Sequence, residues 1–212
     1  MPRGRPKPLR REKLDWETVR ESLIAFFVPE EERGRLRGDV VTFTVAGILT
    51  ARFEADVHDP ARHGWLEFEV TEADRDRWGV DTVALAKAAG WNSTSSSEWP
   101  AIAEGVRVYA YPEEDSDRIS HLLAPSPLLE HSDRPDPGIM MVATPTKAFL
   151  AGSGDADGER FLLEAATEDC VGRPPLTKRP LIVNDGWTGW NLLPDDQNPL
   201  AAEYARRFGP VH

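Results

Sequence analysis

The sequence predicts an α+β protein of antiparallel sheets and short flanking helices, preceded by a disordered basic N-terminal arm. Alternating apolar and polar residues, the pattern of a strand with one buried face, fill residues 39–70 and recur after residue 139. Stretches with apolar residues at helical spacing lie between and after these strands. The chain has 212 residues, 40% of them hydrophobic, and is long enough to bury a core.

The first half of the body is expected to begin with a helix and to continue as an antiparallel meander. Asp15 is a suitable N-cap for an amphipathic helix that extends to Phe27, just before Pro29. A charged loop over residues 30–38 follows. Because β-branched and aromatic residues then alternate with polar ones, we predict strands at 40–45, 48–57 and 65–70.

Two helices are expected after the meander. Thr71 is a candidate cap for a helical turn, and Asp81 is one for a helix over 82–89 that Gly90 ends. Next we predict a polar flexible segment at 93–97, a strand at 106–111 and a short helix at 116–123.

A proline-rich connection, residues 125–138, is the best candidate for a domain boundary. It separates an α+β domain of residues 15–124 from residues 139–212, which form a smaller α+β domain or a continuation of the same one. In this second part we predict strands at 139–143 and 148–151, a helix at 159–169, a hairpin at 181–192 and a helix at 199–208.

Charge divides the chain into a basic arm and an acidic body. Residues 1–14 hold six basic residues against Glu12, a net charge of +5, whereas the rest holds 19 basic and 35 acidic residues, a net charge of −16. An acidic body repels nucleic acid, so any contact with DNA has to come through the arm. The body itself suits a basic protein partner.

Residues 2–8 read Pro-Arg-Gly-Arg-Pro-Lys-Pro and resemble the AT-hook, a short DNA-binding motif with an Arg-Gly-Arg-Pro core. The prolines favour an extended backbone, and glycine lets that backbone approach the floor of a groove. Arginines on such a backbone fit the narrow minor groove of A·T-rich DNA, where negative potential is concentrated, and further basic residues neutralise phosphates. The predicted DNA contacts are Arg3, Gly4, Arg5, Pro6, Lys7, Arg10 and Arg11.

Two other interpretations of residues 1–14 stay open. The arm is a solvated tail with a basic bias, or it docks on an acidic neighbour such as another copy of this protein.

Residues 153–164 partly follow the calcium-loop pattern, which needs oxygen ligands at alternate positions and a distal glutamate. Arg160 stands where that pattern places an apolar residue, so we expect no metal and no other cofactor. The alternative is a polar turn in which Asp157 or Asp155 caps the following helix. The candidate ligands are Ser153, Asp155, Asp157 and Glu164.

Trp187 and Trp190 lie in a Gly-Trp-Thr-Gly-Trp hairpin. Tryptophans of this kind either pack within the fold or form an exposed patch that binds a partner, so both residues are candidate partner contacts.

From Thr144 to Thr177 the order of strand, acidic turn and helix is similar to the C-terminal part of the uncharacterised YtpQ-type bacterial proteins. The similarity covers a minor part of the chain and implies no catalytic residues.

These observations predict a non-enzymatic, cytoplasmic accessory protein that binds A·T-rich DNA through its arm and a protein partner through its acidic body. The single cysteine, Cys170, excludes an internal disulfide, and no set of nucleophile, base and stabilising groups emerges. No signal or membrane segment is expected. One alternative is an acidic module that regulates a basic partner, as immunity proteins and inhibitors do; another is an enzyme with an unrecognised site.

Overall fold

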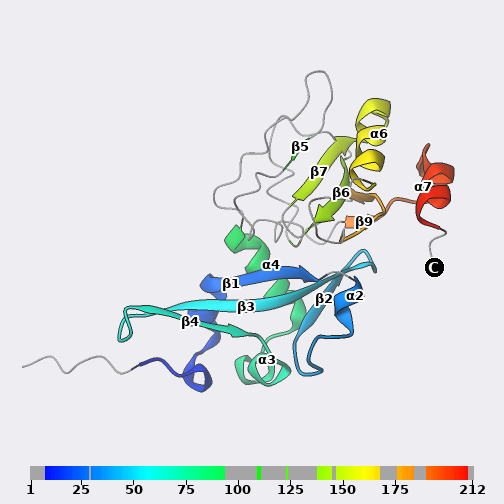
Figure 1. Ribbon diagram of the computed structural model, residues 1–212. Helices are drawn as coiled ribbons and strands as arrows, with labels where there is room; N and C mark the ends of the chain where they lie inside the picture. Colours follow the sequence, from blue (N-terminus) through cyan, green and yellow to red (C-terminus); the bar gives the residue numbers. More distant parts are fainter. Residues whose placement is uncertain are drawn as a thin grey trace, which may run out of the picture.

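The computed structural model confirms the α+β class and its antiparallel sheets (Figure 1). It describes residues 8–28, 30–93, 109–110, 123, 138–144, 147–167, 176–183 and 190–209. The first sheet contains β1 (Leu23–Val28), β2 (Thr42–Val45), β3 (Leu49–Asp59) and β4 (Gly64–Glu69). The second contains β5 (Tyr109–Ala110), β6 (Gly138–Thr144), β7 (Lys147–Gly152), β8 (Leu181–Val183) and β9 (Trp190–Leu192).

The described helices are short, and one of them, α2, lies where the sequence predicted a loop. The α-helices are α1 (Trp16–Val19), α2 (Glu30–Arg33), α3 (Glu72–Trp78), α4 (Thr82–Ser93), α6 (Ala156–Ala165) and α7 (Ala201–Phe208). The 3-10 helices are η1 (Arg11–Lys13), η2 (Arg20–Ser22) and η5 (Asp195–Gln197).

Strand β3 is the long central strand of the first sheet. β1 runs antiparallel along one of its edges, with Leu23 opposite Ala55. On the other edge β2 pairs with the beginning of β3 and β4 pairs with its end. The three strands predicted within residues 39–70 and their antiparallel pairing are confirmed. They do not form the predicted meander, because β1, a strand that the sequence did not predict, occupies one edge of β3 and leaves β2 and β4 on the other.

The segment from Leu23 to Val28 is a strand rather than the second half of the predicted helix. Helix α1 ends at Val19, and the chain passes through η2 into β1. The side chains of Leu23, Ala25 and Phe27 are buried, which is the period of two of a strand. The helical prediction was wrong because a short apolar run fits both spacings, and pairing with β3 decides between them.

Helix α4 continues through Gly90 to Ser93, beyond its predicted end. Its last turn is held from outside, because the side-chain amide of Asn92 donates to the carbonyl of Arg20 at 2.7 Å and to that of Leu23 at 3.0 Å. These two hydrogen bonds stabilise the last turn of α4, which the low helix propensity of Gly90 disfavours.

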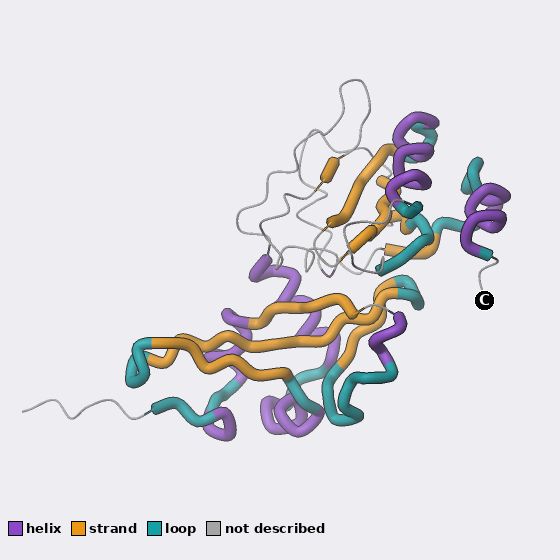
Figure 2. The backbone as a smooth tube through the Cα atoms, viewed as in Figure 1, coloured by secondary structure: helices purple, strands orange, loops and turns teal. Residues whose placement is uncertain are grey.

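The second sheet has the strand order β5-β7-β6-β8-β9 and confirms the predicted strands and hairpin after residue 138. Helix α6 lies along this sheet, and α7 lies beyond it (Figure 2). Of the strand predicted at 106–111 the structure describes only β5, and of the helix at 116–123 only Leu123. The proline-rich connection lies outside the described residues except for Gly138, which begins β6.

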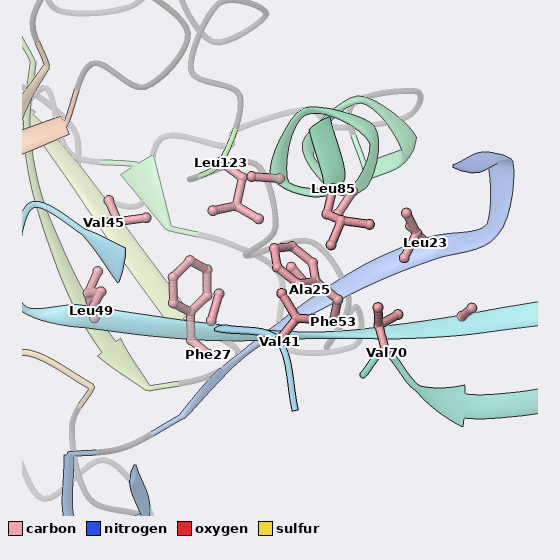
Figure 3. Packing of buried hydrophobic residues seen from close by; sticks show 14 of the residues in the cluster. Leu23, Ala25, Phe27, Val41, Val45, Leu49, Phe53, Val70, Leu85 and Leu123 are labelled. Atoms are coloured by element: carbon pink, nitrogen blue, oxygen red, sulfur yellow. The ribbon is translucent and has the colours of Figure 1, made fainter. Parts of the chain in front are cut away.

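One buried cluster joins the two sheets. Figure 3 shows Phe27, Phe53 and Leu85 packed together above the first sheet, with Leu123 beside them. The second sheet adds the buried side chains Ala148, Leu150, Leu181 and Trp190 to this cluster. A smaller cluster under α6 and α7 includes Leu162, Leu163 and Tyr204.

Candidate nucleic-acid interface

The base of the arm, residues 8–14, is ordered and rests on the body, although the sequence predicted disorder as far as residue 14. The backbone N–H of Leu9 donates to Asp59 Oδ2 at 3.0 Å, and Leu14 is buried. Apolar residues between the basic ones explain the difference, because they reach the core. Five predicted DNA contacts lie outside the described residues: Arg3, Gly4, Arg5, Pro6 and Lys7.

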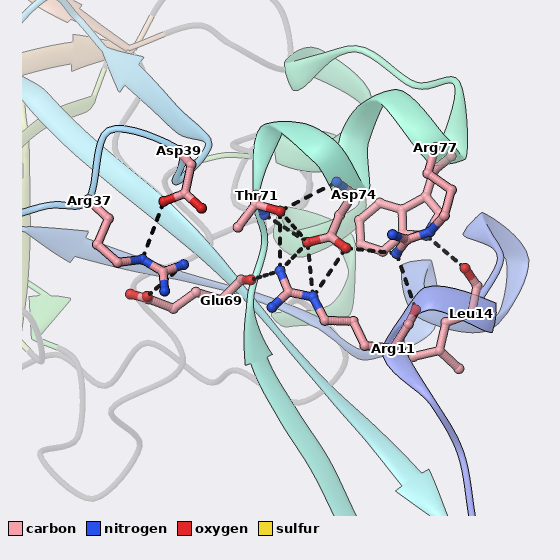
Figure 4. A network of polar contacts seen from close by, with 9 residues as sticks. Arg11, Leu14, Arg37, Asp39, Glu69, Thr71, Asp74 and Arg77 are labelled. Carbon is pink, nitrogen blue, oxygen red and sulfur yellow. Dashed lines mark hydrogen bonds and ion pairs between the residues drawn. The ribbon is translucent and has the colours of Figure 1, made fainter.

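Arg11 holds the base of the arm through a network on the first sheet and α3 (Figure 4). Its Nε lies 3.1 Å from each carboxylate oxygen of Asp74, and Nη2 also contacts that carboxylate. Nη2 donates in addition to the carbonyl of Glu69 at 2.7 Å and to Thr71 Oγ1 at 3.2 Å. The guanidinium carbon lies 4.7 Å from the centre of the Phe68 ring.

Asp74 is placed by the first turn of α3. Thr71 is the N-cap, as predicted, and it forms a capping box with Asp74: the Thr71 N–H donates to Asp74 Oδ2 at 3.0 Å. The Asp74 N–H in turn donates to Thr71 Oγ1 at 3.4 Å. Only 2% of the Asp74 side chain is exposed. The capping box therefore fixes a buried carboxylate next to the guanidinium group of Arg11.

Hydrogen bonding keeps this carboxylate ionised. Burial alone would raise the pKa of Asp74, but hydrogen bonds from Arg11, Thr71 and Arg77 hold that pKa well below its usual value. Arg77 Nη2 donates to Asp74 Oδ1 at 2.7 Å and to the carbonyl of Arg11 at 3.2 Å. We call this set of contacts between Arg11, Asp74 and Arg77 the anchor of the arm. The hydrogen bonds that Asp74 accepts from the two arginines are both charge-assisted.

Trp78 adds an uncharged contact, because its Nε1 donates to the carbonyl of Leu14 at 2.9 Å. Together with Asp59 and Asp74, it forms an attachment surface that sequence reasoning missed. The spacing of Thr71 and Asp74 is a capping-box signal, but it does not indicate that an arginine 63 residues away binds the same carboxylate.

The structure corrects the role predicted for Arg11. A buried carboxylate without a cation is costly, so Arg11 is bound to Asp74 and does not project as a phosphate contact. Arg10 and Lys13, on the same segment, are exposed. Of the three basic residues in this segment, Arg11 is therefore held by Asp74, whereas Arg10 and Lys13 are exposed to solvent.

The calcium-loop candidates do not converge on one point. Asp155 is the N-cap of α6, where it accepts from the Gly158 N–H at 3.2 Å, and Glu164 forms an ion pair with Arg207 of α7 at 2.8 Å. Ser153 and Asp157 are exposed. Within the described ranges, no group of three or more histidine, cysteine, aspartate or glutamate side chains is placed to hold a metal ion.

Trp190 is not an exposed partner contact. It is 2% exposed and belongs to the main buried cluster, because the pairing of β8 with β9 turns it inward. Trp187 lies outside the described residues.

None of the described helices has the length and apolar character needed to cross a membrane. No protein-family description, curated protein or solved structure matches this chain, so the two resemblances seen in the sequence stay predictions.

Proposed function

We propose that this protein is a non-enzymatic, DNA-associated accessory protein whose anchored N-terminal arm binds the minor groove of A·T-rich DNA. Its acidic body binds a protein partner. Arg3 and Arg5 are the groove contacts, with Lys7, Arg10 and Lys13 as phosphate contacts.

The attachment of Arg11 to Asp74 is the observation that supports this proposal most directly. It ties the base of the arm to the body at a fixed point, where the end of β4 meets the first turn of α3 (Figure 4). The seven residues before Pro8 can extend at most about 25 Å from it. Residues 8–14 are already held on the body, so they add little to the conformational freedom lost on binding.

The charges near the anchor fit the same function. Asp74 neutralises Arg11, whereas Arg10 and Lys13 remain exposed next to the segment that carries Arg3 and Arg5. The rest of the chain is strongly acidic and repels phosphate, so the arm has to supply the attraction.

The test is a titration of the full chain onto A·T-rich and G·C-rich duplexes at low and physiological salt. We expect tighter binding to A·T, weaker binding at higher salt, and loss of binding in the double variant Arg3→Ala/Arg5→Ala. Arg10→Ala lowers the slope of log K against log salt by about one, whereas Arg11→Ala leaves that slope unchanged.

Arg206→Ala is the matched control, because this arginine is 71% exposed on α7, far from the arm. It is expected to bind DNA as the wild type does. Equal affinity for both duplexes, or wild-type binding by the double variant, would reject the DNA-binding function.

A further inference from the structure

The first sheet has one face turned toward the core and one turned away, which we call the outer face. Along β3 the buried residues Phe53, Ala55 and Val57 alternate with partly exposed ones, and the register with β1 and β4 places partners opposite them. The outer face includes Ile24, Phe26, Thr42, Arg52, Glu54, Asp56, His58, Trp65, Glu67 and Glu69.

This face is acidic, with four carboxylates and one arginine. Glu54 lies directly opposite Glu69, and Asp56 lies directly opposite Glu67. Like charges opposite each other on neighbouring strands are unfavourable, so a cation beside such a pair is stabilising.

Arg52 shows how the face binds a guanidinium group. It forms ion pairs with Glu54 and Glu69, the latter with Nη1 2.8 Å from Oε1. Its guanidinium carbon lies 5.2 Å from the centre of the Phe26 ring. One arginine is thus held between two opposed carboxylates and an aromatic ring.

A carboxylate and an aromatic ring also lie together two residues further along the strands, a distance of about 7 Å. There Glu67 and Trp65 are neighbours on the outer face of β4. Trp65 is 59% exposed although its ring packs edge-on against His58, with the centroids 5.2 Å apart. Glu67 is exposed as well.

We propose that the outer face binds an extended, arginine-rich segment of a partner protein, with an arginine guanidinium stacked on Trp65 and paired with Glu67. The inference rests on the protein-binding part of the proposed function and gives it a surface. The charge of the face selects a basic occupant. The exposed ring of Trp65 favours arginine over lysine, because a planar guanidinium can stack on a ring while two of its N–H groups donate to a carboxylate.

The experiment measures binding of a fluorescent peptide of alternating arginine and serine to the full chain by anisotropy. We expect saturable binding that weakens with salt, and weaker binding of a lysine–serine peptide. Trp65→Ala and Glu67→Gln should each raise Kd about threefold, and the double variant about tenfold. Both side chains are exposed, so the variants should unfold at the wild-type temperature.

Glu17→Gln is the matched control, because Glu17 is an exposed glutamate on α1 that is absent from the outer face, and its Kd should equal that of the wild type. Wild-type affinity of the double variant, or equal binding of a glutamate–serine peptide, would overturn the proposal. Failure of the DNA-binding function is seen separately: Arg3→Ala/Arg5→Ala should keep peptide binding, and Trp65→Ala/Glu67→Gln should keep DNA binding.

Discussion

Asp74 is the residue on which the base of the arm depends most. Its buried carboxylate accepts hydrogen bonds from Arg11 and Arg77 while it also completes the cap of α3 with Thr71. Arg11 and Arg77 are about a third exposed, so solvent screens part of each ion pair. The loss of the carboxylate leaves two arginines without their shared partner.

Asp74→Asn is therefore expected to lower the free energy of unfolding at pH 7 by about 2 kcal/mol. The pKa of Asp74 is lowered in the folded state, so its contribution is present above the unfolded pKa of 3.8 and is lost as pH falls below it. Urea unfolding of wild type and variant between pH 7 and pH 3 should show the difference in stability shrinking toward acid. A difference that stays constant over this range would show that the ionised carboxylate is not what stabilises the fold.

Helix α6 packs so closely against strand β7 that only glycine fits at position 158. Gly158 lies in the first turn of α6, and a Cβ at that position would approach the Cβ of Ala151 to 2.8 Å. A Cβ atom cannot move away as the end of a flexible side chain can, so the helix would have to shift from the sheet.

Gly158→Ala is expected to destabilise the protein by about 1–2 kcal/mol, because the clash outweighs the gain in helix propensity of about 1 kcal/mol. The urea midpoint should fall while the slope of the transition stays the same. The control is Gly34→Ala, at a position where an added Cβ meets nothing within 4 Å. If Gly158→Ala raised the midpoint, propensity would dominate and the close approach would be relieved by a small shift.

At the scale of the whole molecule, the protein combines a basic segment with an acidic sheet face. The base of the arm lies on the core side of the first sheet, with Leu9 at Asp59, whereas Trp65 and Glu67 lie on the other side. DNA on the arm and a basic partner on the outer face would therefore approach different surfaces.

Two truncated variants distinguish the contribution of residues 8–14 to stability from that of residues 1–7. Removal of residues 1–7 should change the free energy of unfolding by less than about 0.5 kcal/mol. Removal of residues 1–14 should cost about 3–5 kcal/mol, because it exposes the surface under Leu14 and takes the Arg11 cation from Asp74. Thermal unfolding of both variants measures this, and equal midpoints would show that residues 8–14 add nothing to the fold.

Features that depend on a local pattern could be predicted from the order of residues. Alternation predicted the strands within residues 39–70 and after residue 138. Thr71 was readable as a helix cap, and Asp155 was one of two aspartates predicted to cap the next helix, because a cap is satisfied within one turn. The division into basic arm and acidic body follows from the order of charges alone.

Three other features depend on contacts between distant parts of the chain. These contacts made Leu23–Val28 a strand, buried Trp190, and bound Arg11 to Asp74. In each case the outcome depends on a partner far away in the chain: β3 for the strand, the shared core for the tryptophan, and the first turn of α3 for the arginine. The sequence pattern indicates the secondary structure that a segment favours. Whether a side chain is buried or its charge is neutralised depends on the distant groups that the fold places next to it.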